Sequence, residues 1–196
     1  MLSLQKNLGG SQMMVLLVLL LLAGICAVFL VGVYNRMIRN RNLVDEAWSG
    51  IDVQLKRRSN LVNNIVETVK GYASHEKEVF ERVTEARART NSAGTVQERA
   101  SAENALTGAL KTLFAVAENY PELKANTNFL QLQQTLSDLE NEIQMARRYY
   151  NGSVRDYNNT IQVFPNSFLA SMFNFNSREY FEADEGARVV PKVSFQ

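Results

Sequence analysis

The chain has 196 residues, and its 21 lysine and arginine residues nearly balance its 20 aspartate and glutamate residues. This balance gives no overall positive field of the kind that a nucleic-acid-binding protein uses. The single cysteine, Cys26, excludes a disulfide framework and a thiolate metal site. Three prolines and ten glycines leave little room for a turn-rich sheet protein. We therefore expect an all-α chain.

An apolar, uncharged stretch runs from Met13 to Val33, after a short N-terminal tail at residues 1–12. About 20 apolar residues cross the hydrocarbon core as one helix, so we predict a transmembrane helix at residues 13–34. A cleaved signal peptide would have a shorter apolar core that ends in small residues. A lipid anchor on Cys26 would need a small residue where Ile25 stands. A buried core helix is disfavoured, because no other segment is apolar enough to enclose it.

The charges that flank the predicted span indicate its orientation. Lys6 lies before it, whereas Arg36, Arg39 and Arg41 follow it directly. Lysine and arginine accumulate on the cytoplasmic side of a membrane. The pattern therefore favours a single-pass protein of the inner (cytoplasmic) membrane. Its N-terminus would lie outside and its large C-terminal domain in the cytoplasm, rather than the reverse.

Residues 35–164 are predicted to form an elongated antiparallel bundle of three long helices. The first is a rod from about Tyr34 to Thr90, because its apolar positions recur in steps of four and three, as in a coiled coil. This seam consists of Val44, Trp48, Ile51, Leu55, Arg58, Val62, Ile65, Val69, Tyr72, Glu76, Val79, Val83 and Ala86. We expect one continuous helix through all of them.

Arg58 and Glu76 are the two charged residues on the seam. A charge at such a position is costly unless it is paired, and a paired charge can specify register or partner. Glu140 or Glu142 of the antiparallel third helix, or an acid from another subunit, could pair with Arg58. Alternatively, Arg58 lies at the edge of the seam and extends to solvent.

The second helix is predicted to begin after the capping box formed by Thr95 and Glu98, and to stop at Pro121. Its apolar face would consist of Ala102, Leu106, Ala109, Leu113, Val116 and Tyr120. The third helix runs from about Phe129 toward Phe164. It carries a polar and aromatic strip that includes Tyr149, Tyr150 and Tyr157, which forms either an intersubunit surface or, as is more common, interhelical packing.

Residues 165–196 are predicted to form a short apolar helix and an extended tail. The helix covers about residues 167–175, and Asn174 is expected to be its left-handed cap. Phe168 and Phe173 make this segment rich in aromatic side chains. They would contact either the membrane surface or a partner subunit, or the helix would be a lid over the open end of the bundle.

The sequence offers little for catalysis. His75 is the only histidine, and we expect it in mid-helix with only carboxylates nearby, too few ligand types for a typical metal site. Ser74 would point to a different helix face, so no His-activated nucleophile is expected. No glycine-rich phosphate loop is present. We predict no catalytic, cofactor-binding or metal-binding residue, and no enzyme.

Several segments resemble the hallmark motifs of the LemA family of bacterial membrane proteins. They read AWSGIDVQLKRR at 47–58, VKGYASHE at 69–76 and YPELKAN at 120–126, followed by Ala146-Arg147, Tyr150-Asn151, Phe164-Pro165 and Phe181-Glu182. The resemblance implies one N-terminal span and a helical bundle, and no defined enzymatic activity, cofactor or ligand. The chain departs from the family at Asn63, where a proline is frequent, and at Asn174, where glycine is usual. A straight helix through Asn63 and an intact cap at Asn174 are expected.

The combined reading predicts a membrane-anchored helical scaffold that self-associates into a homo-oligomer and organises membrane or partner proteins. The lipid bilayer and other membrane proteins are its expected partners, and nucleic acid is not. The alternative is a monomeric adaptor or sensor that docks a signalling protein or a membrane protease complex. The candidate self-association or partner contacts are Arg58, Glu76, Tyr150, Phe168 and Phe173.

Overall fold

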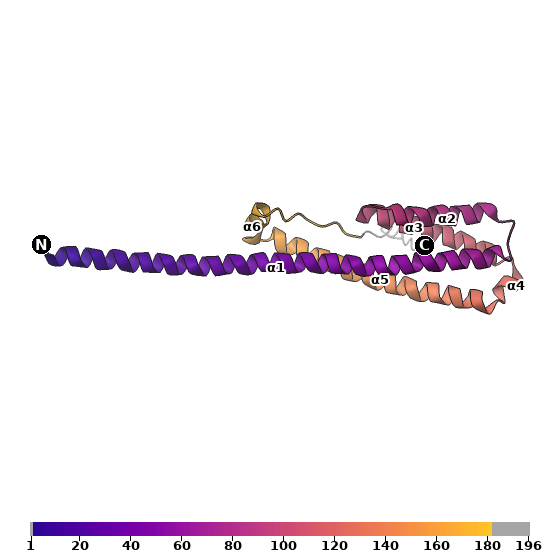
Figure 1. The fold of residues 1–196 in the computed structure, drawn as a ribbon, viewed down its shortest axis with the longest axis horizontal. Helices are drawn as coiled ribbons and strands as arrows, with labels where there is room; N and C mark the ends of the chain where they lie inside the picture. Colours follow the sequence, from indigo (N-terminus) through magenta and orange to yellow (C-terminus); the bar gives the residue numbers. More distant parts are fainter. Residues whose placement is uncertain (1, 182–196) are drawn as a thin grey trace, which may run out of the picture. The chain divides into compact units, whose positions relative to one another are not determined.

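The computed structural model describes the backbone of residues 2–181 and the side chains of residues 13–181. Helices account for most of these residues, and no strand occurs among them, which confirms the all-α prediction (Figure 1). The helices are α1 (Leu2–Lys70), α2 (Lys77–Ser92), α3 (Val96–Ala117), α4 (Pro121–Lys124), α5 (Thr127–Gln162) and α6 (Asn166–Met172). The part of the expected tail at residues 182–196 lies outside the described residues.

Two compact units make up the chain, and we describe each by itself. Unit 1 consists of Met1–Leu43 and Asp156–Ser177, and unit 2 consists of Val44–Arg155 and Arg178–Gln196. The long helices α1 and α5 contribute residues to both units.

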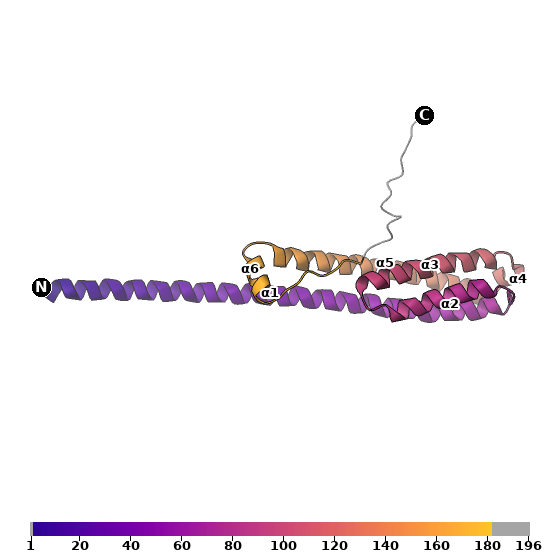
Figure 2. The same cartoon turned by 90° about the horizontal axis from the view of Figure 1, so that it is seen from above.

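Unit 2 is a four-helix bundle built from the C-terminal part of α1, from α2 and α3, and from most of α5. Successive helices run in opposite directions along the bundle in both views (Figures 1 and 2). Each helix buries one apolar face in a shared core, as amphipathic helices do in water. Core residues include Val62, Ile65, Val69, Phe80, Val83, Leu106, Leu110, Leu113, Phe129 and Leu136.

The prediction of one continuous rod is wrong, because this segment forms two helices. α1 ends at Lys70, and the chain turns through residues 71–76 before α2 begins at Lys77. The turn starts with backbone hydrogen bonds between residues three apart, as the Gly71 N–H binds the Thr68 carbonyl at 3.3 Å and the Tyr72 N–H binds the Val69 carbonyl at 3.0 Å. Glycine is a poor helix former, which favours termination here. The bundle therefore has four long helices rather than the three that we predicted.

The apolar residues keep their spacing of four and three on both sides of this turn, because α1 and α2 each bury one face in the same core. Val69 before the turn and Val83 after it are both fully buried, whereas Tyr72 within it is 39% exposed. Helical periodicity describes which face is buried, and it does not distinguish one long helix from two that meet in a hairpin. The α1 segment does continue through Asn63 without interruption, as expected.

The beginning of α3 matches its prediction. The Glu98 N–H binds the Thr95 hydroxyl at 3.1 Å, and the Glu98 carboxylate accepts hydrogen bonds from the backbone N–H groups of Thr95 and Gly94. These bonds form the expected capping box, and they hold the pKa of Glu98 below its ordinary value. Pro121 does not end α3, which stops earlier at Ala117, and it is instead the first residue of α4.

Unit 1 has a small core of its own, in which α6 packs beside α1. The rings of Tyr34 and Phe173 lie edge to face with centroids 5.0 Å apart. Asn40 of α1 donates a hydrogen bond of 2.8 Å to Thr160 of α5. The core consists mainly of Met37, Tyr157, Ile161, Leu169, Ala170 and Phe175.

The end of α6 confirms the cap predicted at Asn174. This residue has a φ of 57°, and the Phe175 N–H reaches back to the Ala170 carbonyl at 2.9 Å. The two features together make a Schellman motif, in which asparagine replaces the usual glycine. Phe175 is 8% exposed, so the cap directs its ring into the core of unit 1.

The apolar stretch at residues 13–33 belongs to α1, and its residues 13–32 are exposed. Among the described helices, α1 alone is long and apolar enough to cross a membrane, and its most apolar window has no buried residue. Residues 2–12, which we described as a tail before the span, are also helical and form the start of α1.

We expect the substitution Thr95→Ala to lower the free energy of unfolding by about 1 kcal/mol, because an N-cap hydroxyl is lost. Thr112→Ala is the matched control, since the Thr112 hydroxyl binds only the Gly108 carbonyl within the same helix. Urea unfolding of the detergent-solubilised chain, followed by circular dichroism, measures both. Equal effects of the two substitutions would contradict a stabilising role for the capping box.

Candidate functional site

The most unusual feature of unit 2 is a cluster of charged side chains inside the bundle. Arg58 of α1 is 1% exposed, and so is Glu103 of α3. The Arg58 guanidinium lies 2.8 Å from the Glu103 carboxylate and 2.7 Å from the Glu140 carboxylate of α5. It also donates a hydrogen bond of 2.8 Å to the Thr107 hydroxyl. One side chain thus joins three helices.

This placement confirms that Glu140 of the antiparallel helix pairs with Arg58. The pairing partner comes from the same chain, and Arg58 does not extend to solvent. Glu142, the other predicted partner, lies 3.0 Å from the exposed guanidinium of Arg57 instead. Because Arg58 is enclosed by its own bundle, it can contact a second subunit only if the cluster opens.

Arg147 of α5 is the fourth charged member of this cluster. Burial lowers the pKa of its guanidinium, and the nearby Glu103 carboxylate opposes that shift. Burial raises the pKa of the Glu103 carboxyl, and the attraction of Arg58 counteracts this only in part. The Glu140 side chain is 34% exposed and lies at the edge of the cluster. Two carboxylates thus compensate the charges of two guanidinium groups. We call Arg58, Glu103, Glu140 and Arg147 the ion cluster.

A second set of polar contacts, one ion pair and one hydrogen bond, connects α1 to α3 and α2. Asp52 of α1 pairs with Arg99 of α3 and, at 2.7 Å, with Lys56 one turn away. The hydrogen bond from Lys56 and the charge of Arg99 hold the pKa of Asp52 below its ordinary value of 3.8. Arg87 of α2 donates a hydrogen bond of 2.9 Å to the Ser59 carbonyl. Arg99 and Arg87 thus hold α3 and α2 to α1, whereas the Lys56–Asp52 pair lies within α1.

Glu76 and Tyr150, two of the predicted contact residues, also bind within the chain. Glu76 lies in the turn between α1 and α2, where it accepts a hydrogen bond of 3.1 Å from the Tyr120 hydroxyl. Tyr150 is 3% exposed, and its hydroxyl donates to the Glu179 carbonyl at 2.9 Å. Tyr150 therefore belongs to interhelical packing, whereas its neighbour Tyr149 is 55% exposed.

Residues 178–181 form an extended strap that α5 binds through Tyr150 and Asn151. The Asn151 amide donates to the Phe181 carbonyl at 3.0 Å and accepts from the Phe181 N–H at 2.8 Å. The Arg147 guanidinium lies 4.6 Å from the centroid of the Phe181 ring, and the Trp48 ring lies 6.2 Å from it. The strap thus covers the edge of the ion cluster.

Phe168 and Phe173 are the predicted contact residues that remain at the surface. Phe168 is 72% exposed and Phe173 is 49% exposed. The opposite face of α6 is buried through Leu169 and Ala170. α6 therefore covers the core of unit 1 with one face, as a lid would, and presents aromatic groups with the other.

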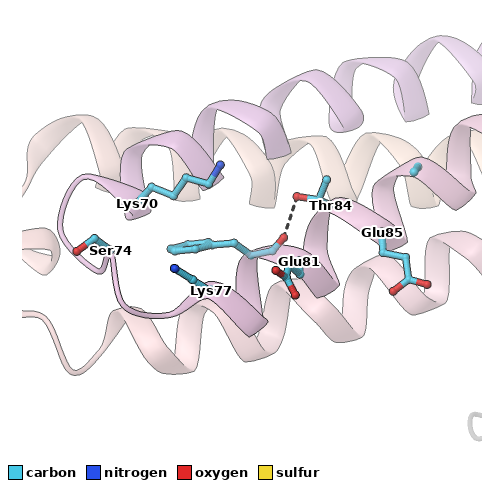
Figure 3. A pocket seen from close by; sticks show the side chains of 8 residues that line it. Lys70, Ser74, Lys77, Glu81, Thr84 and Glu85 are labelled. Carbon is cyan, nitrogen blue, oxygen red and sulfur yellow. Dashed lines mark hydrogen bonds between the residues drawn. The ribbon is translucent and has the colours of Figure 1, made fainter.

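A groove runs along α2 beside the α1–α2 turn and has a volume of about 670 Å³ (Figure 3). Phe80 forms its apolar floor, and the Lys70 ammonium lies 5.9 Å from the centroid of that ring. Lys77 and Glu81 also line the groove. Glu85 lines it as well, so the groove combines an apolar floor with charged side chains.

His75 does not lie in mid-helix as we expected, because it is an exposed residue of the turn at 71–76. Nowhere between residues 13 and 181 do three or more His, Cys, Asp or Glu side chains gather in a way that could hold a metal ion. His75 is thus neither buried nor part of a ligand set there.

Comparison with known proteins places these features in a family. Residues 47–195 match the LemA family. The chain belongs to the LemA family. It is 28% identical to Protein LemA of Metamycoplasma hominis over 185 residues, which cover 92% of this chain and 83% of that protein. It is 26% identical to Magnetosome protein MamQ of Magnetospirillum gryphiswaldense, with 88% of this chain and 73% of that protein covered.

A third relative is Magnetosome protein MamQ 2 of Paramagnetospirillum magneticum, which is 26% identical with 76% of this chain and 64% of that protein covered. None of these three names states an enzymatic activity. Family membership and the uncovered apolar helix agree with a membrane-associated chain.

We expect Arg58→Ala to lower the free energy of unfolding by about 3–5 kcal/mol, because it leaves the buried Glu103 carboxylate without its main partner. The adjacent Arg57→Ala is the control and should cost about 0–1 kcal/mol, since that pair is exposed. Urea unfolding in detergent measures both. Similar values for the two variants would show that the buried pair adds no more than a surface pair.

The lowered pKa of Asp52 predicts an acid-sensitive contact. Because its folded pKa lies below the unfolded value, the Asp52 ion pairs stabilise the fold above pH 3.8, and this contribution is lost as pH falls through the folded pKa. The variant Asp52→Asn should therefore have a flatter dependence of the unfolding midpoint on pH in the acidic range. The control is Asp138→Asn, at an exposed site on α5. A slope unchanged from the wild type would contradict the prediction.

Proposed function

We propose that this chain is a membrane-anchored, non-enzymatic scaffold that self-associates into a homo-oligomer at the bacterial inner membrane. It would organise membrane or partner proteins there. The observation that carries the proposal is that the buried charged side chains of the bundle pair with one another. Arg58, Glu103 and Glu140 hold α1, α3 and α5 together. These charged residues therefore have a structural role rather than a catalytic one, and the exposed apolar residues are available for contacts with other molecules.

The anchor supports the membrane part of the proposal. The stretch at residues 13–33 is apolar on every side, and only a lipid or protein environment satisfies such a surface. Arg36, Arg39 and Arg41 follow it directly, which favours a cytoplasmic bundle and an N-terminus outside.

Self-association has a candidate surface on the outside of α5. Met145 and Tyr149 are one helical turn apart and therefore lie on the same face, and they are 54% and 55% exposed. Val53 of α1 is a third large apolar residue of unit 2 that is 55% exposed. An anchored chain diffuses in two dimensions, where weak apolar contacts of this kind are sufficient to assemble copies.

The alternative is a monomeric adaptor or sensor that docks a signalling protein or a membrane protease complex. The groove along α2 favours this reading, because it offers an apolar floor at Phe80 with lysine and glutamate at its rim. Such a mixture of apolar and charged groups suits an amphipathic helix of another protein.

The two readings differ in the mass of the full-length protein. Light scattering of the gently solubilised chain, with the detergent contribution subtracted, should give one discrete multiple of 22.1 kDa. Tyr149→Glu should reduce that mass, because a carboxylate would be desolvated in the contact. Leu130→Glu is the matched control, since Leu130 is an exposed apolar residue of the same helix, at 50% exposure.

A monomeric mass that persists in native lipid would overturn the scaffold and favour the adaptor. The groove would then be tested directly with Lys77→Glu and Glu81→Lys, two surface substitutions at its lining, scored by recovery of the proteins that co-purify with the wild-type chain.

A further inference from the structure

Unit 1 exposes a compact group of large apolar side chains where α5 gives way to α6. We call these residues the apolar corner, and they are Val163, Phe164, Phe168, Met172 and Phe173. Phe164 is 89% exposed, and the others are between 49% and 72% exposed. All five fall between residues 163 and 173 of the chain, and a concentration of exposed large apolar side chains is typical of a contact surface.

The exposure of this corner is built into the local backbone. Leu169 and Ala170 are 4% exposed and hold one face of α6 against the core. Phe168 and Met172 are one turn apart on the opposite face. The Schellman motif at Asn174 then turns the chain back, so that Phe175 enters the core. The Phe168 side chain therefore cannot turn inward without displacing the residues that hold α6 in place.

The corner lies next to the end of the apolar stretch of α1. Tyr34 directly follows Val33, the last residue of that stretch, and its ring contacts Phe173 at 5.0 Å and Phe175 at 5.8 Å between centroids. Tyrosine is enriched where a membrane meets water. All of these residues belong to unit 1.

Polar and cationic groups accompany the corner. A groove of about 420 Å³ is lined by Arg36, Asn40, Asn159 and Asn166, with Asp156 as its one carboxylate. Val163 of the corner also lines this groove, so apolar and hydrogen-bonding surfaces adjoin. At a bilayer surface, acyl chains could contact the apolar side chains, and phosphate and glycerol oxygens could accept hydrogen bonds from the arginine and asparagine groups.

We propose that the apolar corner inserts into the interfacial layer of the same bilayer that α1 crosses, with the adjoining polar groove among the phospholipid headgroups. The inference rests on the membrane span of the proposed function and does not depend on self-association. The corner is thus a second membrane contact, and it comes from the opposite end of the sequence to the anchor.

The test measures the depth of single labelled positions in the full-length chain. The chain has one cysteine, Cys26, which lies in the span and is exposed on α1. A bimane fluorophore is attached to Cys26 in the wild type, or to a new cysteine in Cys26→Ser chains that carry Phe168→Cys, Phe164→Cys or Leu130→Cys. Each protein is reconstituted in phosphatidylcholine–phosphatidylglycerol vesicles whose lipids carry a nitroxide quencher either near the headgroup or near the acyl-chain end.

We expect labels at positions 168 and 164 to be quenched most strongly by the nitroxide near the headgroup. The label on Cys26 should be quenched most strongly by the nitroxide near the acyl-chain end. The label at position 130, a matched exposed leucine of α5, should be quenched several-fold less by either lipid. Two independent corner positions keep the test valid if one substitution disturbs α6.

Two results would overturn the inference. Corner labels that resist lipid quenching but are quenched by nitroxide-labelled copies of the chain would assign the corner to a second copy. Corner labels that only aqueous iodide quenches would leave the corner in water. In both cases the Cys26 label separates the failures, because its loss of quenching by the deep nitroxide would instead contradict the membrane span.

Discussion

The pairing of Arg58 with two carboxylates is the interaction on which the bundle depends. Its guanidinium contacts Glu103 of α3 and Glu140 of α5 from α1, and α2 joins at the neighbouring residue through the bond from Arg87 to Ser59. Apolar seams alone allow helices to slide by one turn at little cost, whereas a buried ion pair is satisfied in only one register. We therefore infer that the cluster favours one alignment of the helices, a role that does not require it to be more stabilising than a well-packed apolar replacement.

Much of the fold follows from local patterns that the sequence displays openly. The apolar stretch at 13–33, the capping box at Thr95 and Glu98, and the left-handed cap at Asn174 each depend on a few adjacent residues, and the structure contains all three. The α1–α2 hairpin was missed, because the spacing of apolar residues keeps its four-three rhythm through the six residues of the turn. Gly71 was the only local sign that the helix ends. The end of α1 depends on how α2 packs against it, and a short stretch of sequence around the turn does not contain that information.

The ion cluster was predictable only in part. Arg58 stands out because it interrupts an apolar seam, and its antiparallel partner Glu140 follows from the bundle topology. The predicted apolar face of α3 was correct at Ala102, Leu106 and Leu113, which are buried. Glu103 was missed because the buried stripe also runs through Glu103 and Leu110, which we had not assigned to it, whereas Ala109 is only partly buried. Alanine-rich helices leave the phase ambiguous, so a charged residue on the correct stripe reads as a surface residue.

The strap at residues 178–181 has a consequence for how the molecule can be observed. Asn151 binds the main chain of Phe181 rather than its side chain, so attachment requires the backbone to be extended at that position. Once attached, Phe181 lies beside Trp48, the single tryptophan of the chain. The protein thus carries a native optical probe at the point where its C-terminal segment joins the bundle. Release of that segment would expose the indole to water and shift its emission, without any added label.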